Sequence, residues 1–258
     1  MSVHCRSLVL AAALFALLGM GSAAFAQEAS PGHEHWKSSW TGYLWTPGFN
    51  GDAIIAGTPV DVDVSVSDAI DVLDEVETSF AGHYEGNKEP WGVVADISYW
   101  RMKFDFMTAA GPGECKPSQW IVELAGARTM SIKKMGENTV QRVQALVGGR
   151  YNQLKLKAKV PDADIDASKS RNYFDPFVGA RVFQALSRQW GANFRADVGG
   201  FGIGSDLSWQ VIATFGYNIS EKNSILLGWR YYSQDYEKDD FEWEVAQSGP
   251  FLAWQTRF

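Results

Sequence analysis

The chain has 258 residues, enough for one large domain with a sizeable core. It is 46% hydrophobic, 14% aromatic and 21% charged, which excludes a disordered tail and a highly charged coiled coil. The formal net charge of -7 argues against nucleic-acid binding, because phosphate neutralisation needs clustered Lys and Arg. With two Cys residues, a disulfide framework and a Cys-based zinc site are also excluded.

Residues 1–26 have the pattern of a secretory signal peptide. Arg6 supplies a positive charge, residues 8–18 are apolar, and Ala24–Ala26 has the small-x-small pattern that precedes a cleavage site. The apolar run is shorter than the ~20 residues that a spanning helix needs. We expect cleavage before Gln27, an N-terminal lead over residues 27–35 and one domain over residues 36–258.

The mature chain alternates apolar and polar residues in segments that end in aromatic side chains. No stretch after residue 26 is long and apolar enough for a spanning helix. Period-two alternation over about ten residues, separated by turns, is typical of a transmembrane β-barrel. The expected strands are Trp36–Thr46, Val76–Asn87, Trp91–Met107, Gln119–Lys133, Thr139–Lys159, Arg171–Leu186, Gln189–Phe201, Leu207–Asn218, Ser224–Tyr236 and Phe241–Phe258.

Short and long connections alternate along the chain. The short ones lie at residues 87–90, 135–138, 187–188 and 220–223, and the long ones at 47–75, 108–118 and 160–170. Bacterial barrels have short periplasmic turns and longer outer loops, so both termini are expected on the periplasmic side. The predicted fold is all-β: a closed antiparallel up-and-down barrel of about 10 strands, with 8 or 12 as alternatives.

One strand illustrates the two faces. Leu207, Trp209 and Val211 share a face, and Ser208 and Gln210 share the other. A water-soluble β-barrel that binds a ligand would show the same period with its apolar face turned inward, and this remains an alternative. The many long strands and the aromatic residues, which favour the membrane interface, support the membrane barrel.

The last strand ends in an aromatic residue, Phe258, and places Leu252, Trp254 and Thr256 on the same face. This resembles the C-terminal signal by which the barrel assembly machinery recognises outer-membrane barrels. We therefore expect that machinery, outer-membrane lipid and lipopolysaccharide as partners, and the bacterial outer membrane as the location.

Several stretches resemble a family of uncharacterised proteobacterial outer-membrane β-barrel proteins. They are Trp40–Trp45 (WTGYLW), Val60–Val76, Gly82–Gly86 (GHYEG), Trp91–Tyr99 (WGVVADISY), Val147–Tyr151, Asp175–Arg181 (DPFVGAR), Arg195–Trp209 and Gly249–Pro250. The resemblance implies the fold and the outer-membrane location. It carries no activity and no catalytic residues.

The polar face carries charged residues that we expect to line the lumen: Glu85, Asp96, Arg150, Asp175, Arg181, Arg195, Asp197 and Arg230. They could form a charged constriction that selects solutes, or acid–base pairs that fill a narrow barrel. Because a ten-stranded barrel is close to the size that side chains fill, a structural protein or a narrow porin-like channel is favoured.

The 47–75 segment is rich in acids. It contains two short alternating runs, and Ser67 could cap a short helix over Asp68–Glu75. The segment could be an acidic lid over the lumen, a solvated outer loop, or an extra strand pair that raises the count to twelve. The lid would carry Asp61, Asp63, Asp68, Asp71 and Asp74.

Two further patterns suggest binding or chemistry. Lys155, Lys157 and Lys159 share a face near an outer strand end, where they could contact lipopolysaccharide phosphates. His83 stands beside Glu85 at strand spacing, the arrangement of a base with an orienting carboxylate, so a lipid-modifying hydrolase is an alternative function. We expect neither a metal site nor a cofactor, because the pair His33 and His35 has no further ligand cluster.

Overall fold

The computed structural model describes residues 36–55, 58–64, 76–108, 111–160, 165–239 and 241–258, and all its regular elements in these ranges are strands. The strands are β1 (Lys37–Trp45), β2 (Gly48–Ile55), β3 (Thr58–Val64), β4 (Val76–Lys88), β5 (Trp91–Met102), β6 (Phe104–Thr108), β7 (Gly111–Lys134), β8 (Val140–Val160), β9 (Ile165–Ala185), β10 (Trp190–Gly200), β11 (Leu207–Asn218), β12 (Asn223–Lys238) and β13 (Phe241–Arg257). The expected helix at Asp68–Glu75, the signal peptide and the lead lie outside the described residues. Within these ranges, no helix has the length and apolarity to cross a membrane.

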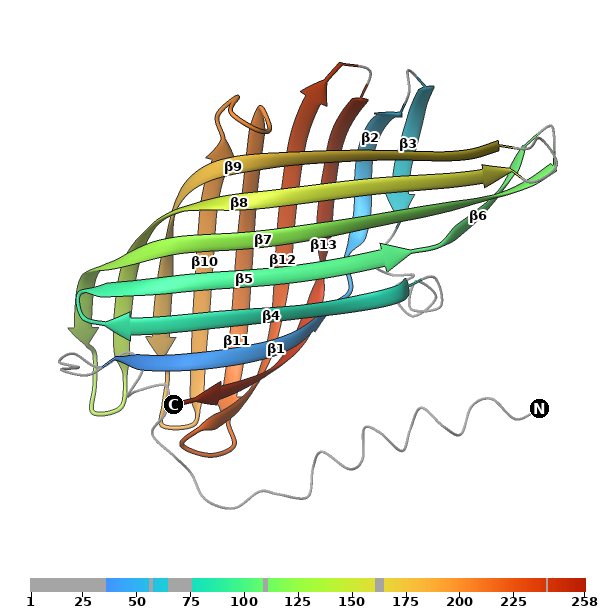
Figure 1. Cartoon of the computed structure of the whole chain (residues 1–258). Helices are drawn as coiled ribbons and strands as arrows, with labels where there is room; N and C mark the ends of the chain where they lie inside the picture. The colour runs from blue at the N-terminus through green and yellow to red at the C-terminus, as the bar shows by residue number, and fades with distance from the viewer. Residues whose placement is uncertain (1–35, 56–57, 65–75, 109–110, 161–164, 240) are drawn as a thin grey trace, which may run out of the picture.

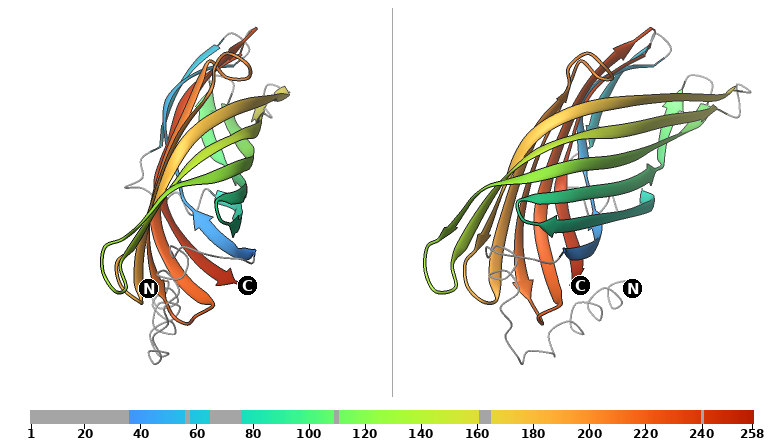
Figure 2. Two further views of the ribbon diagram at one scale, coloured as in Figure 1. Left: turned by 90° about the vertical axis from the view of Figure 1, so that its left-hand side faces the viewer. Right: turned by 60° about the vertical axis from the view of Figure 1, so that its left-hand side comes forward.

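The strands close into a ring (Figure 1). Among the described residues, ten strands follow one another as β1-β4-β5-β7-β8-β9-β10-β11-β12-β13, and β13 pairs back on β1. All these pairs are antiparallel. Figure 2 shows the strands tilting around the axis, as closure of a barrel requires. The predicted closed, up-and-down barrel of ten strands is confirmed.

Two expected outer loops are shorter than predicted. Residues 111–118 belong to β7 and pair with β6 and β8, and residues 165–170 belong to β9. Pro112 and Pro117 favoured a loop, because proline cannot donate to a ladder. Both neighbouring strands nevertheless continue past these positions, so the ladder extends through them.

The 47–75 segment begins as a wall strand. β1 pairs with the last part of β13 and β2 pairs with its first part, so β1 and β2 form one interrupted strand along β13. The interruption is at Thr46 and Pro47, where the Thr46 N–H donates to the Pro250 carbonyl at 3.2 Å. β3 then pairs with β2, so the expected extra strand pair exists as a hairpin on the rim and the ring keeps its ten members.

The two ends of the barrel differ. One end, here called the lower end, carries the tight turns after β4, β7, β9 and β11 together with the start of β1 and the end of β13. There the Phe258 N–H donates to the Ser38 carbonyl at 2.9 Å, so the first and last strands meet. At the opposite, upper end β7, β8 and β9 extend well beyond β4 and β5 (Figure 1).

The outer face carries an apolar belt. Leu124 and Val147 are 62% and 65% exposed, although both belong to wall strands that are paired on both sides. Aromatic clusters border the belt: Tyr99 packs on Trp120 with ring centroids 4.6 Å apart near the upper end, and Trp190 stacks on Phe215 at 5.0 Å near the lower end. Eight residues separate Trp91 from Tyr99 along β5, roughly 26 Å of strand. At a strand tilt of about 40° this length spans roughly 20 Å along the barrel axis, most of the ~25 Å apolar band of a transmembrane barrel.

The inner face is layered from the lower end upward. Charged residues lie at mid-height, and above them an amide layer contains Gln119, Asn152, Gln234 and Gln247, all buried. In this layer the Gln119 side-chain amide donates to Gln234 at 3.0 Å. The upper lumen is filled by a buried apolar layer of Phe49, Ala53, Trp100, Met102, Leu154, Leu156, Tyr173, Tyr236, Phe241, Trp243 and Val245.

Candidate functional site

Strand alternation brings charged side chains into the lumen. In β7, Ile121, Glu123 and Ala125 are buried inside, while Val122 and Leu124 are exposed outside. Glu123 stands in register with Asp96 of β5 and Arg150 of β8. Charges from three adjacent strands therefore lie at one height.

Glu123 is the centre of this charge layer, which consists of Asp96, Glu123, Arg150, Arg195, Asp197, Gln210 and Arg230. The Glu123 carboxylate lies 2.9 Å from Arg150 Nε, 2.7 Å from Arg195 Nη2 and 3.2 Å from Arg230 Nη2. Three guanidinium groups from β8, β10 and β12 thus converge on one carboxylate.

Asp197 also binds two of these three guanidinium groups, those of Arg150 and Arg195. Its carboxylate lies 2.6 Å from Arg150 Nη2 and accepts from Arg195 Nε at 2.9 Å. The Gln210 side-chain amide donates to Asp197 at 2.9 Å and to Glu123 at 3.0 Å. With Asp96, the layer holds three carboxylates against three guanidinium groups, so its formal charges balance and buried ions satisfy one another.

Aromatic rings complete the packing of the charge layer. The Arg150 guanidinium lies 4.7 Å from the Tyr232 ring centroid and 5.0 Å from that of Phe177. Arg230 lies 4.8 Å from the Trp45 ring centroid. Tyr232 lies between Arg230 of the charge layer and Gln234 of the amide layer on β12 and clusters with Trp45, whereas Phe177 packs with Ala125 and Leu146.

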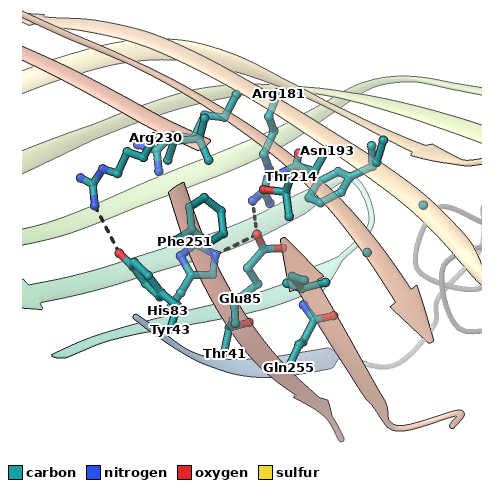
Figure 3. Close-up of a pocket in the computed structure, with 18 of the residues that line it drawn as sticks. Thr41, Tyr43, His83, Glu85, Arg181, Asn193, Thr214, Arg230, Phe251 and Gln255 are labelled. Carbon is teal, nitrogen blue, oxygen red and sulfur yellow. Dashed lines mark hydrogen bonds and ion pairs between the residues drawn. The ribbon is translucent and has the colours of Figure 1, made fainter. Parts of the chain in front are cut away.

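His83 lies just below the charge layer between two carboxylates. Its Nδ1 is 3.1 Å from Asp96 Oδ2. Its Nε2 is 3.0 Å from Glu85 Oε1, and Arg181 Nη1 reaches the same Glu85 oxygen at 2.5 Å (Figure 3). Imidazole can donate to both carboxylates only when it carries two protons. In that state His83 has no lone pair with which to act as a base.

A small cavity lies below the charge layer. Its volume is about 110 Å³, and His83, Glu85, Arg181, Asn193 and Thr214 are among its lining residues (Figure 3). This volume accommodates several water molecules. It is smaller than the roughly 300 Å³ at which pockets for drug-sized ligands begin.

The structure places all eight predicted lumen residues inside the barrel, but not in one cluster. Asp96, Arg150, Arg195, Asp197 and Arg230 share the charge layer, and Glu85 and Arg181 form the pair below it. Asp175 is separate, because its carboxylate accepts the Ser205 backbone N–H at 2.7 Å and so holds the turn between β10 and β11.

Sequence reasoning missed Glu123, the most connected residue of the lumen. The signal was present, because Glu123 is the single charged residue between Ile121 and Ala127 and alternates with Val122 and Leu124. Gln210 and Tyr43 were also missed. The Tyr43 hydroxyl donates to Asp96 at 2.9 Å and accepts from Arg230 at 3.2 Å.

The five aspartates of the predicted lid fall partly inside and partly outside the described residues. Asp61 and Asp63 lie in β3, in register with Asp52 and Asn50 of β2, whereas Asp68, Asp71 and Asp74 lie outside the described residues. The predicted lid over the lumen is therefore untested and stays a prediction.

Lys155, Lys157 and Lys159 are exposed on the outer face of β8. His33 and His35 fall outside the described part of the chain. Within that part, His, Cys, Asp and Glu side chains form no group of three or more that could hold a metal ion.

The distribution of polarity defines the class of protein. A water-soluble barrel turns its apolar faces inward, because burying apolar surface drives its folding. Here the inward face carries the ions and amides, the outward face carries the apolar belt, and ring closure leaves no unpaired sheet edge between the aromatic clusters. The protein is an integral outer-membrane β-barrel, and the water-soluble binding barrel does not fit this surface.

Comparison with known proteins gives similarity in structure alone. No family model and no curated protein matches the chain. The structure is similar to Ail, the attachment invasion locus protein of Yersinia pestis, with 14% identity, 88% of this chain and 100% of that chain covered, and a TM-score of 0.41. It is also similar to the outer membrane protease OmpT of Escherichia coli (9% identity, 89% and 100% covered, TM-score 0.48) and to Neisserial surface protein A (7% identity, 86% and 97% covered, TM-score 0.36).

Proposed function

We propose that this protein is a closed, non-conducting barrel with a structural role in the outer membrane, with its lower end in the periplasm and its upper end outside the cell. The observation that supports this most is the charge layer, in which Arg150 is 0% and Glu123 2% exposed. The ionic groups at mid-height bind one another, whereas a solute-selecting constriction presents its charges to the passing solute.

The upper lumen supports the same conclusion. Above the amide layer, Trp100, Tyr173 and Trp243 belong to one buried apolar cluster, in which Trp100 packs on Phe49 and Tyr173 stacks on Tyr236. A hydrated ion would have to cross an apolar layer as well as a layer of paired charges, and both steps cost desolvation free energy. A narrow porin-like channel is therefore the less favoured form of the predicted function.

The proposed role is also non-enzymatic. Both ring nitrogens of His83 lie within hydrogen-bond distance of a carboxylate, Nε2 of Glu85 and Nδ1 of Asp96, and these contacts hold the ring below a closed layer. A hydrolase base needs a free lone pair directed at a nucleophile or a water molecule. The contacts of His83 instead favour a role in holding β4 against β5.

Planar-bilayer recording tests the closed lumen. The refolded mature protein is expected to show no stepwise conductance. The double variant Arg195→Ala and Arg230→Ala opens the charge layer but leaves the apolar layer in place, so we expect no steady current from it. A variant that also carries Trp100→Ala and Trp243→Ala in the apolar layer is expected to conduct, with cation selectivity from the remaining Asp96, Glu123 and Asp197. The matched control is Arg128→Ala, on the outer face over the Trp91 ring. Steady conductance of the unchanged protein would exclude the closed barrel.

A further inference from the structure

Basic side chains gather on the outer face where β5, β7 and β8 rise above the apolar belt. We define the basic wall as Arg101, Lys103, Lys116, Lys155 and Lys157. Backbone pairing sets Arg101 beside Ser118 and Ser118 beside Lys155, which makes one row. Lys116 pairs with Lys157 in the row above.

The basic wall starts directly above an aromatic cluster. Tyr99 lies two residues below Arg101 on β5 and packs on Trp120 and Phe80. The Arg101 guanidinium lies 5.8 Å from the Tyr99 ring centroid. Since Tyr and Trp favour the headgroup level of a membrane, the two basic rows lie where lipid phosphates are found.

The basic wall is short of negative charge. Lys116 and Lys157 are directly opposed like charges, an arrangement that destabilises a strand pair. Glu114 pairs with Lys103 at 2.7 Å and with Lys116 at 2.9 Å. Lys155 and Lys157 are exposed and make no hydrogen bond or ion pair with the described residues.

The opposite wall has the reverse charge at a similar height. On β12, β13 and β2, the acids Asp235, Glu244 and Asp52 stand in register in one row, and Glu237 pairs with Glu242 in the next. We define these five residues as the acidic wall. Its first row lies five residues above the charge layer, counted from Arg230 to Asp235 on β12, and Arg101 lies five residues above Asp96 on β5. The upper outer surface is therefore divided into two halves of opposite sign.

We propose that the basic wall binds the phosphate groups of lipopolysaccharide in the outer leaflet, with the acyl chains lying along the apolar belt below. Three basic strands, an adjoining aromatic cluster and a shortage of local carboxylates complement a lipid that carries several phosphates above acyl chains. This inference rests on the proposed function, because it requires the upper end to face outward.

Lys159 is not part of the site. It stands in the row above Lys157, in register with Glu114, so its row contains a carboxylate. The sequence run of three lysines thus gives two members of the wall. Arg101, Lys103 and Lys116 come from positions up to 56 residues away from Lys157 and join them only through the pairing of β5, β7 and β8.

Binding of purified bis-phosphorylated lipid A tests the proposal. The mature protein in detergent is titrated and the bound lipid is measured by native mass spectrometry. Lys155→Gln with Lys157→Gln is expected to weaken binding roughly thirtyfold, at about 1 kcal/mol for each of the two basic residues near a membrane surface. Asp235→Asn with Glu244→Gln on the acidic wall is the matched control, and it is expected to leave the affinity unchanged or raise it.

Three results would overturn the proposal: equal affinity of the lysine variant, equal affinity for dephosphorylated lipid A, or displacement of the lipid by inorganic phosphate alone. Heat-modifiable migration of each variant shows that the barrel is folded. Folding and conductance are measured separately from lipid binding. A protein that is folded and non-conducting but binds no lipid A would therefore contradict the lipopolysaccharide proposal and not the proposal of a closed barrel.

Discussion

Glu123 shows how one residue can determine the inside of a barrel. Its carboxylate accepts from Arg150, Arg195 and Arg230, and it is flanked by neighbours whose exposed apolar side chains point to the belt. Each guanidinium group has a second contact, with Asp197, Gln210 or an aromatic ring. The removal of one carboxylate therefore affects three strands at once.

At the residue scale we predict that Glu123→Gln lowers the free energy of unfolding by about 3 kcal/mol, because it leaves buried guanidinium groups without their counter-charge. Urea unfolding in detergent micelles, followed by tryptophan fluorescence, measures this change. Glu237→Gln is the control, since Glu237 is exposed on the outer face. A loss as small as that of the control would show that the lumen is hydrated enough to compensate the charges.

At the element scale, β2 depends on a glycine to follow β13. Gly51 has a φ of +146°, which L side chains rarely adopt. A Cβ at this position would overlap the carbonyl oxygen of Glu244 on the paired strand. The β2–β3 hairpin is thus attached to the ring at a point that has no room for a side chain.

We predict that Gly51→Ala detaches this hairpin from β13 while the ten-stranded ring remains closed. Limited proteolysis of the reconstituted protein should then cut within residues 47–75 at least several-fold faster, without loss of heat-modifiable migration. Gly42→Ala is the matched control, because no atom lies within 4 Å of a Cβ placed there. Unchanged proteolysis of Gly51→Ala would show that β2 tolerates a shift along β13.

At the scale of the whole molecule, the barrel has two unlike ends. Tight turns and both chain ends mark the lower end, and the extended strands β7, β8 and β9 mark the upper end. The charged outer walls stand only above the upper aromatic clusters, so the molecule has a defined polarity across a membrane.

This polarity predicts labelling from one side. In a Cys115→Ser background, Ser168→Cys at the upper end is expected to react with a membrane-impermeant maleimide on intact cells. Glu221→Cys in a lower turn should react only after the cells are broken. Both positions are exposed, so their intrinsic access to the reagent is matched. Labelling of the lower position alone on intact cells would reverse the proposed orientation and remove the basis for lipopolysaccharide binding.

The sequence by itself determined the alternation, the ten strands and the sorting of side chains to two faces. These are local properties: in Leu207–Asn218, each residue's face follows from its own position in a period of two. Local patterns also located most of the turns of the lower end. Where prolines interrupt the pattern, as at Pro117, sequence reasoning began the strand too late, at Gln119 instead of Gly111.

Only the tertiary structure decided which charges meet. Glu123 and Arg230 are 107 residues apart, and their contact depends on the register of every strand between them and on the closure of β13 on β1. The same is true of the basic wall, in which Arg101 and Lys155 share a row only because β5, β7 and β8 pair in one register. Strand register is a non-local property, because each pairing fixes the position of the next around the ring.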